Sequence, residues 1–128
     1  GLGSDVWISG LYDFTVEYMT REGIIPSNPK LWEYIDNTWK EYKTLPVVRT
    51  NFEVGRKSFF LREEVVKWHE AVTEQEPYGV FRYRWGDAQI RVLTAALFGT
   101  SDEILFASHA GYNHGRGICA QHFNSVLR

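Results

Sequence analysis

The sequence has little cysteine and no concentration of positive charge. A single cysteine, Cys119, stands among the 128 residues, so the chain can form no disulfide within itself and gives no sign of an oxidising compartment. Its 14 Lys and Arg are balanced by 16 Asp and Glu, for a net charge of −2 without a basic block. Nucleic-acid-binding proteins generally present a clustered basic face. We therefore expect no nucleic-acid partner.

Long apolar runs are also missing. No stretch approaches the roughly 20 consecutive apolar residues of a transmembrane helix. No signal or transit peptide is recognisable either. We therefore expect no membrane span in this chain, and its length suits one domain over residues 1–128.

Aromatic side chains, in contrast, are abundant: five Trp, seven Tyr and eight Phe make up 16% of the residues. Aromatic rings fill cores and interfaces, and this is their commoner use. Their flat apolar faces also suit sugar rings. Both interpretations are compatible with the composition.

Two kinds of local pattern alternate along the chain. Apolar residues at helical spacing predict three helices, over residues 29–45, 58–73 and 88–98. Ser27 or Asn28 is expected to cap the first of them. β-Branched and aromatic residues predict extended segments, at residues 6–18, 47–54, 80–85 and 104–107. The alternation indicates α/β layers. Because these strands are few, we expect the sheet to be completed by a further segment or a partner.

Three short segments follow or adjoin the predicted strands and carry polar side chains: Asn51-Phe52-Glu53, Arg84-Trp85-Gly86-Asp87 and Gly111-Tyr112-Asn113-His114. In α/β folds the ends of strands line the ligand crevice. The three segments together would supply two carboxylates and an imidazole. We expect Glu53, Asp87 and His114 to converge on one cleft.

Each of these three residues also has a simpler interpretation. Asp87 is well placed to cap the helix that follows it, and local chemistry alone favours that role. Glu53 can be a solvated residue before a turn, and His114 an exposed residue of a glycine-rich loop. His69, beside the apolar stripe of the second helix, is expected to be a packing residue rather than a ligand.

Taken together, the segments resemble glycosyltransferase family 15, the fungal-type α-1,2-mannosyltransferases, in the C-terminal part of the catalytic domain. Residues 51–64 are similar to that family's Asn-Phe-Glu-Ile and Phe-Phe-Arg-Ser-Glu segments. Residues 84–88 and 95–98 resemble its Arg-Trp-Gly-Asp-Ala and Ala-Ala-Leu-Phe, and residues 111–114 its Gly-Tyr-Tyr-His. The resemblance covers most of residues 12–119, and Arg-Trp-Gly-Asp-Ala is its most specific part.

The resemblance implies a partial GT-A-like fold of the nucleotide-diphospho-sugar transferase kind. It also implies a reaction in which mannose is transferred from GDP-mannose to a mannoside acceptor. That reaction needs Mn²⁺ and retains the configuration at the anomeric carbon. Glu53 matches the family's nucleophile or stabiliser of the oxocarbenium-like transition state, and Asp87 a residue that orients or deprotonates the acceptor. His114 matches a metal ligand. The resemblance also implies substrate-binding roles for four residues: Asn51, Arg84, Trp85 and Tyr112.

The sequence departs from the family in ways that leave two interpretations open. The family's acidic Glu-Pro-Asp metal motif and most of its nucleotide-binding half lie N-terminal to everything matched here, and the family's cysteine before Asn-Phe-Glu is replaced. The chain is then either a fragment or subunit of a working mannosyltransferase whose donor half lies elsewhere, or an inactive remnant serving as an interaction subunit of a larger assembly. The resemblance implies the Golgi lumen as the compartment, and the missing cysteine and signal anchor weaken that implication. A non-catalytic sugar-binding module is a third class.

Overall fold

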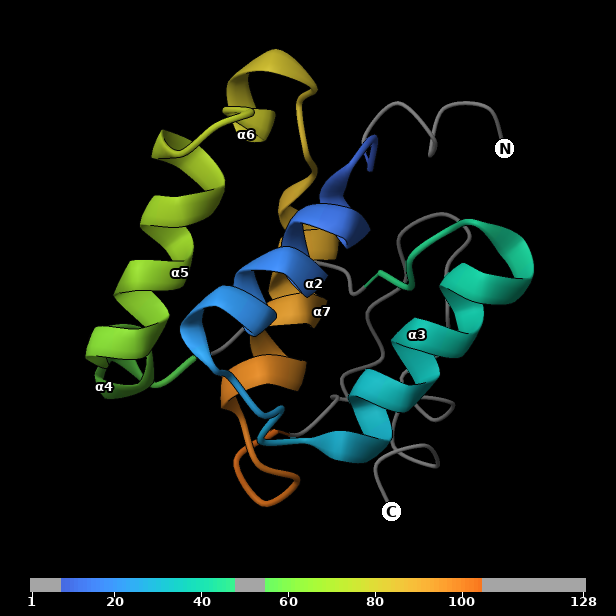
Figure 1. Ribbon diagram of the computed structural model, residues 1–128. Coiled ribbons are helices and arrows are strands. Elements are labelled where there is room, and N and C mark those ends of the chain that lie inside the picture. The colour runs from blue at the N-terminus through green and yellow to red at the C-terminus, as the bar shows by residue number, and fades with distance from the viewer. Residues whose placement is uncertain (1–7, 48–54, 105–128) are drawn as a thin grey trace, which may run out of the picture.

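The computed structural model describes residues 8–47 and 55–104, and within these two ranges every regular element is a helix (Figure 1). Four of the helices are long: α2 (Leu11–Glu22), α3 (Pro29–Tyr42), α5 (Glu63–Glu74) and α7 (Asp87–Phe98). Two single turns lie between them: α4 (Lys57–Phe60) and α6 (Gly79–Arg82). No helix in the described ranges is long and apolar enough to cross a membrane.

α7 is the central helix, and most of its residues from 92 to 98 are buried. It contacts both α3 and α5, which Figure 1 shows on opposite sides of it. α2 completes the packing, because its Phe14 and Tyr18 both lie against the buried ring of Trp68 on α5. The helices thus share one hydrophobic core.

The prediction of an extended segment over residues 6–18 was wrong, because residues 11–22 form α2. The prediction rested on β-branched and aromatic residue types, whereas the spacing of the buried residues is helical. Leu11, Phe14, Thr15 and Tyr18 recur at three- and four-residue intervals and face the core. Packing of this stripe outweighs the weak local preference of Thr15 for a strand.

The predicted strand over residues 80–85 was also wrong. Residues 79–82 form the single turn α6, and Arg84 has a left-handed backbone (φ 56°), which a regular strand does not contain. Six residues of alternating aromatic and arginine side chains were too few to distinguish a strand from a turn. The predicted α/β, GT-A-like layering is therefore not confirmed in the described residues, which are helical. The strands predicted at 47–54 and 104–107 lie almost wholly outside them.

The three predicted helices exist, with one correction. The first and third match α3 and α7 closely, but the second, predicted over residues 58–73, is divided into α4 and α5. Arg62 stands at the break, as the N-cap residue of α5 with an extended ψ of 138°. Its side chain reaches across to the turn that follows α7.

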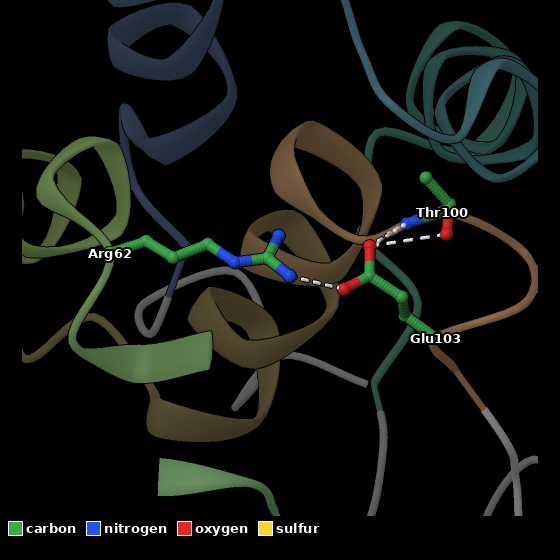
Figure 2. A network of polar contacts seen from close by, with 3 residues as sticks. All are labelled: Arg62, Thr100 and Glu103. Carbon is green, nitrogen blue, oxygen red and sulfur yellow. Dashed lines mark hydrogen bonds and ion pairs between the residues drawn. The ribbon is translucent and has the colours of Figure 1, made fainter. Parts of the chain in front are cut away.

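Figure 2 shows this connection. The Arg62 guanidinium donates to Glu103 Oε2, while Glu103 Oε1 accepts from the backbone N–H and the hydroxyl of Thr100, at 3.2 and 3.1 Å. The Arg62 hydrogen bond, followed by that of the Thr100 backbone, lowers the pKa of Glu103. The network joins the α4–α5 junction to the end of α7.

Asn28 joins two helix ends. Its side-chain Oδ1 accepts from the Leu31 N–H at 3.2 Å and caps the start of α3, as predicted. Its own N–H donates to the Ala96 carbonyl at 3.1 Å, and the Ser27 N–H donates to Leu97 at 3.0 Å. These two carbonyls lie in the last turn of α7, where no intrahelical donor is left.

A small cluster of hydrogen-bonded side chains lies within the apolar contact between α5 and α7. The buried Trp68 indole N–H donates to Thr94 Oγ1 at 2.9 Å, and Thr94 donates to the Ile90 carbonyl at 2.7 Å. His69 Nε2 lies 3.5 Å from the same Thr94 oxygen, and the imidazole stacks on Phe60. His69 is thus a partly buried packing residue, as expected.

We predict that Asn28→Ala lowers the free energy of unfolding by about 1 kcal/mol, the usual contribution of an N-cap side chain. Asn28→Ser, which keeps a capping oxygen, should recover most of the loss. Urea denaturation monitored by circular dichroism measures both. Ser27→Ala is the matched control, because only the backbone of Ser27 bonds to α7. Equal stability of wild type and Asn28→Ala would contradict the capping role.

The stability of the fold should also depend on pH through His69. Burial, and secondarily the charge of Arg91, lower its pKa below the ordinary 6.5. The unfolded chain therefore binds more protons than the folded one, and stability falls as the pH drops from 6.5 through the folded pKa. We expect His69→Gln to flatten this part of the curve in thermal unfolding at several pH values. An unchanged slope would contradict the assignment.

Candidate functional site

The candidate site is built around Trp85, in the connection between α6 and α7. The side chain is buried, with 4% of its surface exposed, and its ring centroid lies 5.2 Å from that of Phe14. Its indole N–H donates to the Ser9 carbonyl at 2.6 Å. One ring thus fixes the connection against the helix α2 and the residues before it.

Gly79 allows the indole to lie where it does. A Cβ atom on Gly79 would stand 2.2 Å from the Trp85 ring, far inside contact distance. The Gly79 carbonyl also accepts from the N–H groups of Tyr83 and Trp85, at 2.9 and 3.2 Å. α6 and the segment that follows it are therefore held together by both backbone and ring contacts.

The backbone of Arg84 reverses the chain between α6 and α7. Its φ of 56° lies in the left-handed region, which is uncommon for residues other than glycine. Such conformations cost free energy and persist where the surroundings enforce them, often at functional sites. Here the buried neighbour Trp85 enforces it, and the Arg84 side chain stays exposed.

Asp87 is the first residue of α7. The structure makes Gly86, not Asp87, the N-cap residue, so the predicted cap was misplaced by one position. Asp87 Oδ1 still accepts from the Ala88 N–H at 2.9 Å. A carboxylate in the first turn is stabilised by the partial positive charge of the helix N-terminus. The side chain is exposed, so it can also meet a ligand.

These residues line one open hollow of about 470 Å³, a size within the range of small-molecule sites. Three of the predicted site residues meet there, namely Arg84, Trp85 and Asp87, together with Gly86. In the described structure this segment therefore forms part of a concave surface. It offers a carboxylate and a guanidinium beside an apolar ring.

Two lining residues were missed in the sequence, Val80 and Gln89. Gln89 is buried on the inner face of α7, in a helix whose other inward residues are nearly all apolar. A polar residue at that position is a signal that could have been found. Val80 gave none, because its segment was taken for a strand.

Four other predicted site residues lie outside the described residues: Asn51, Glu53, Tyr112 and His114. Their convergence with Asp87 stays a prediction. Residues 8–47 and 55–104 hold no group of three or more His, Cys, Asp or Glu side chains able to bind a metal. The described part of the chain does not by itself provide a site fitted to Mn²⁺.

Comparison with known proteins finds similarity to one family of glycosyltransferases. The sequence profile of the glycolipid 2-alpha-mannosyltransferase family matches residues 5–125. The chain is 35% identical over 65 residues to the probable mannosyltransferase KTR2 of Saccharomyces cerevisiae, covering 51% of this chain and 15% of that protein. No solved structure matches it.

Longer matches include two proteins named as glycolipid 2-alpha-mannosyltransferases. Glycolipid 2-alpha-mannosyltransferase 1 of Candida albicans is 28% identical over 84% of this chain, and the Saccharomyces cerevisiae protein 24% identical over 86%. In each case the match covers 24% of the relative. The chain thus spans about a quarter or less of the length of these relatives.

The contact of Gly79 with Trp85 can be tested by a matched pair of glycine substitutions. We predict that Gly79→Ala destabilises the protein by about 1–3 kcal/mol, because the ring has to move in a filled core. Gly86→Ala should cost less, because its Cβ would meet only the end of the flexible Gln89 side chain. Thermal unfolding of both variants measures the two losses of stability. Equal or reversed effects would show that Trp85 is not held as described.

Proposed function

This chain belongs to the glycolipid 2-alpha-mannosyltransferase family, glycosyltransferase family 15, and from that premise we propose that it forms the acceptor-binding part of an α-mannosyltransferase. The donor is GDP-mannose, the acceptor is a mannoside, and the configuration at the anomeric carbon is retained. A Golgi lumenal setting belongs to the same proposal, since it follows from the family resemblance.

One observation carries the proposal. The segment most characteristic of the family, Arg84-Trp85-Gly86-Asp87, is folded around a buried ring at the start of α7, and its carboxylate lines an open hollow. A helix cap alone would not require the hollow, the left-handed Arg84 or the buried indole. A site that has to hold a carboxylate in one place accounts for all three.

The reaction assigns Asp87 its task. The bond between the anomeric carbon and a phosphate oxygen of GDP breaks, a bond to the acceptor oxygen forms, and the acceptor hydroxyl loses its proton. A carboxylate within hydrogen-bond reach can orient that hydroxyl or take its proton. Asp87 is exposed and lines the hollow, where its carboxylate can come within reach of an acceptor hydroxyl.

The remaining roles rest on the family resemblance. Glu53 would stabilise positive charge at the anomeric carbon, and His114 would help to hold Mn²⁺. One imidazole is a poor site for a hard cation, which prefers several oxygen ligands. We therefore propose that acidic residues of the donor half, in a longer chain or in a partner, complete the metal site and bind the nucleotide; Mn²⁺ would supply charge neutralisation at the pyrophosphate.

A second candidate function is a non-catalytic interaction subunit that retains the fold. Exposed apolar side chains favour it, among them Ile25 at 85% and Leu61 at 64%. Where such residues form a contiguous patch, they mark contacts with other chains or segments. They are equally expected where the donor half packs on this one, so activity has to decide between the two.

We predict that Asp87→Asn, in the full-length protein, lowers kcat for mannose transfer to a mannoside by at least about 100-fold, the usual contribution of general acid–base catalysis. Its stability should stay within about 0.5 kcal/mol, since asparagine can also accept from the Ala88 N–H. Release of GDP measures turnover, and urea unfolding measures stability.

Asp102→Asn is the matched control, because Asp102 is an exposed carboxylate in the turn after α7 and does not line the hollow. It should retain wild-type turnover. Full activity of Asp87→Asn would refute the role of Asp87. Absence of transfer by the wild-type full-length protein would instead favour the interaction subunit.

A further inference from the structure

We propose that Gln89 is a specificity-determining residue, whose side-chain amide hydrogen-bonds a hydroxyl of the mannosyl ring that occupies the hollow beside Asp87. The inference rests on the proposed function and deepens it, because it names a second side chain of the same hollow that holds the sugar. The ring can be that of the acceptor or the mannosyl group of the donor, and the test separates the two. The family resemblance assigns Gln89 no role.

Gln89 lies in the hollow itself. It is one of the lining residues, in the first turn of α7 and two positions after Asp87. Its side chain folds back toward the start of the helix, because a Cβ atom on Gly86 would stand 2.2 Å from Gln89 Oε1. Gly86 lines the same hollow. A ligand in contact with Gly86 and Asp87 therefore comes within reach of the amide.

The Gln89 amide has no hydrogen-bond partner in the part of the chain that the structure describes. The residue is nevertheless mostly buried, with 9% of its surface exposed. Buried polar side chains are nearly always hydrogen-bonded, and one that is not lowers the stability of the fold. An amide can donate two hydrogen bonds and accept two. Within the described structure, these are left to molecules that enter the hollow.

The simpler interpretation of Gln89 is a helix cap. The residue stands three positions after the N-cap residue Gly86, from where a glutamine accepts from the N-cap N–H in a capping box. The side chain points in that direction, but the hydrogen bond is not formed among the described residues. Gly86 also has no side chain to supply the reciprocal bond. A capping role therefore leaves the amide unsatisfied, whereas a ligand in the hollow would satisfy it.

The chemistry of the hollow suits a ring that carries several hydroxyls. A hydroxyl both donates and accepts, so neighbouring hydroxyls of a pyranoside can bond the carboxylate of Asp87 and the amide of Gln89 together. A phosphate beside Asp87 would be repelled by its charge. Among the described residues, Trp85 is the only aromatic side chain that lines the hollow, and with 4% exposed it offers no ring face on which a base could stack. These features favour the sugar over the nucleotide.

The test uses the full-length protein and methyl α-D-mannopyranoside, whose dissociation constant is measured by saturation-transfer difference NMR. Gln89→Met keeps the length of the side chain and removes its polar atoms. It should raise the dissociation constant by about tenfold, the effect of losing one or two hydrogen bonds between uncharged groups. The midpoint of urea unfolding should stay the same or rise, because the amide that is removed has no described partner in the free protein.

Gln75→Met is the matched control. Gln75 is exposed, accepts from the Arg21 guanidinium at 2.7 Å and does not line the hollow. The same substitution at this position should leave the affinity for the mannoside at the wild-type value.

Monodeoxy analogues of the mannoside, each lacking one hydroxyl, show whether the contact is direct. The wild type should bind at least one of them about tenfold more weakly than the parent mannoside, because a site that bonds a hydroxyl rejects the analogue without it. Gln89→Met should bind that analogue and the parent equally, since the partner of the hydroxyl is gone. A merely structural role would weaken the binding of every analogue by the same factor and would contradict the inference.

Steady-state kinetics, followed by release of GDP, separates the two sources of the ring. A raised KM for the mannoside acceptor alone would support the inference with the acceptor in the hollow. A raised KM for GDP-mannose, with unchanged affinity for GDP, would support it with the mannosyl group of the donor there. Weaker binding of GDP itself by Gln89→Met, without a change for the mannoside, would overturn the inference in favour of a nucleotide contact.

The remaining outcomes distinguish the inference from the proposed function. Wild-type affinity of Gln89→Met for both the mannoside and GDP-mannose would overturn the inference and leave the proposed function intact. Lost discrimination among the deoxy analogues, in a protein without transferase activity, would support the inference and refute the proposed function. Failure of the wild type to bind either the mannoside or GDP-mannose would overturn both.

Discussion

The burial of the Trp85 indole is the constraint on which the rest of the site depends. The ring can lie between Phe14 and Gly79 only because Gly79 has no side chain, and its N–H is satisfied by the Ser9 carbonyl. A buried indole with a bonded N–H has a single position, so the residues on either side of it are placed as well. Arg84 is forced into a left-handed turn, and Asp87 begins α7 at the rim of the hollow.

The helical frame keeps α7 in place behind this site. Its C-terminal carbonyls accept from the backbone of Ser27 and Asn28, and Asn28 also caps α3. Its inner face packs on α5 through Trp68 and Thr94. The C-terminal end and the inner face of α7 are therefore tied to the rest of the helical frame. A change far from the hollow, such as loss of the Asn28 cap, acts first on stability and only indirectly on Asp87.

Sequence patterns predicted the parts of this fold whose signals are local. The cap of α3 and the periodicity of α3 and α7 sufficed, because Asn28, Pro29 and the apolar run of residues 90–98 act within a few residues. The strand predictions at 6–18 and 80–85 failed because residue type was weighed above spacing, and because the turn at Arg84 is imposed by Trp85 through contacts distant in sequence. The Arg-Trp-Gly-Asp part of the site could be predicted from the family motif, whereas Gln89 and α6 could not, since only the tertiary packing brings them to the hollow.

We propose that Asp87 stands in one catalytic cleft with Glu53 and His114, completed by a donor half outside the matched segment. A crystal structure of the full-length protein with GDP and methyl α-D-mannopyranoside tests it most directly. We expect the mannoside to lie against Asp87, with Glu53 and His114 facing the same cleft and GDP beyond them. Side chains of the three residues on separate faces of the molecule, or a mannoside bound away from the hollow, would contradict it.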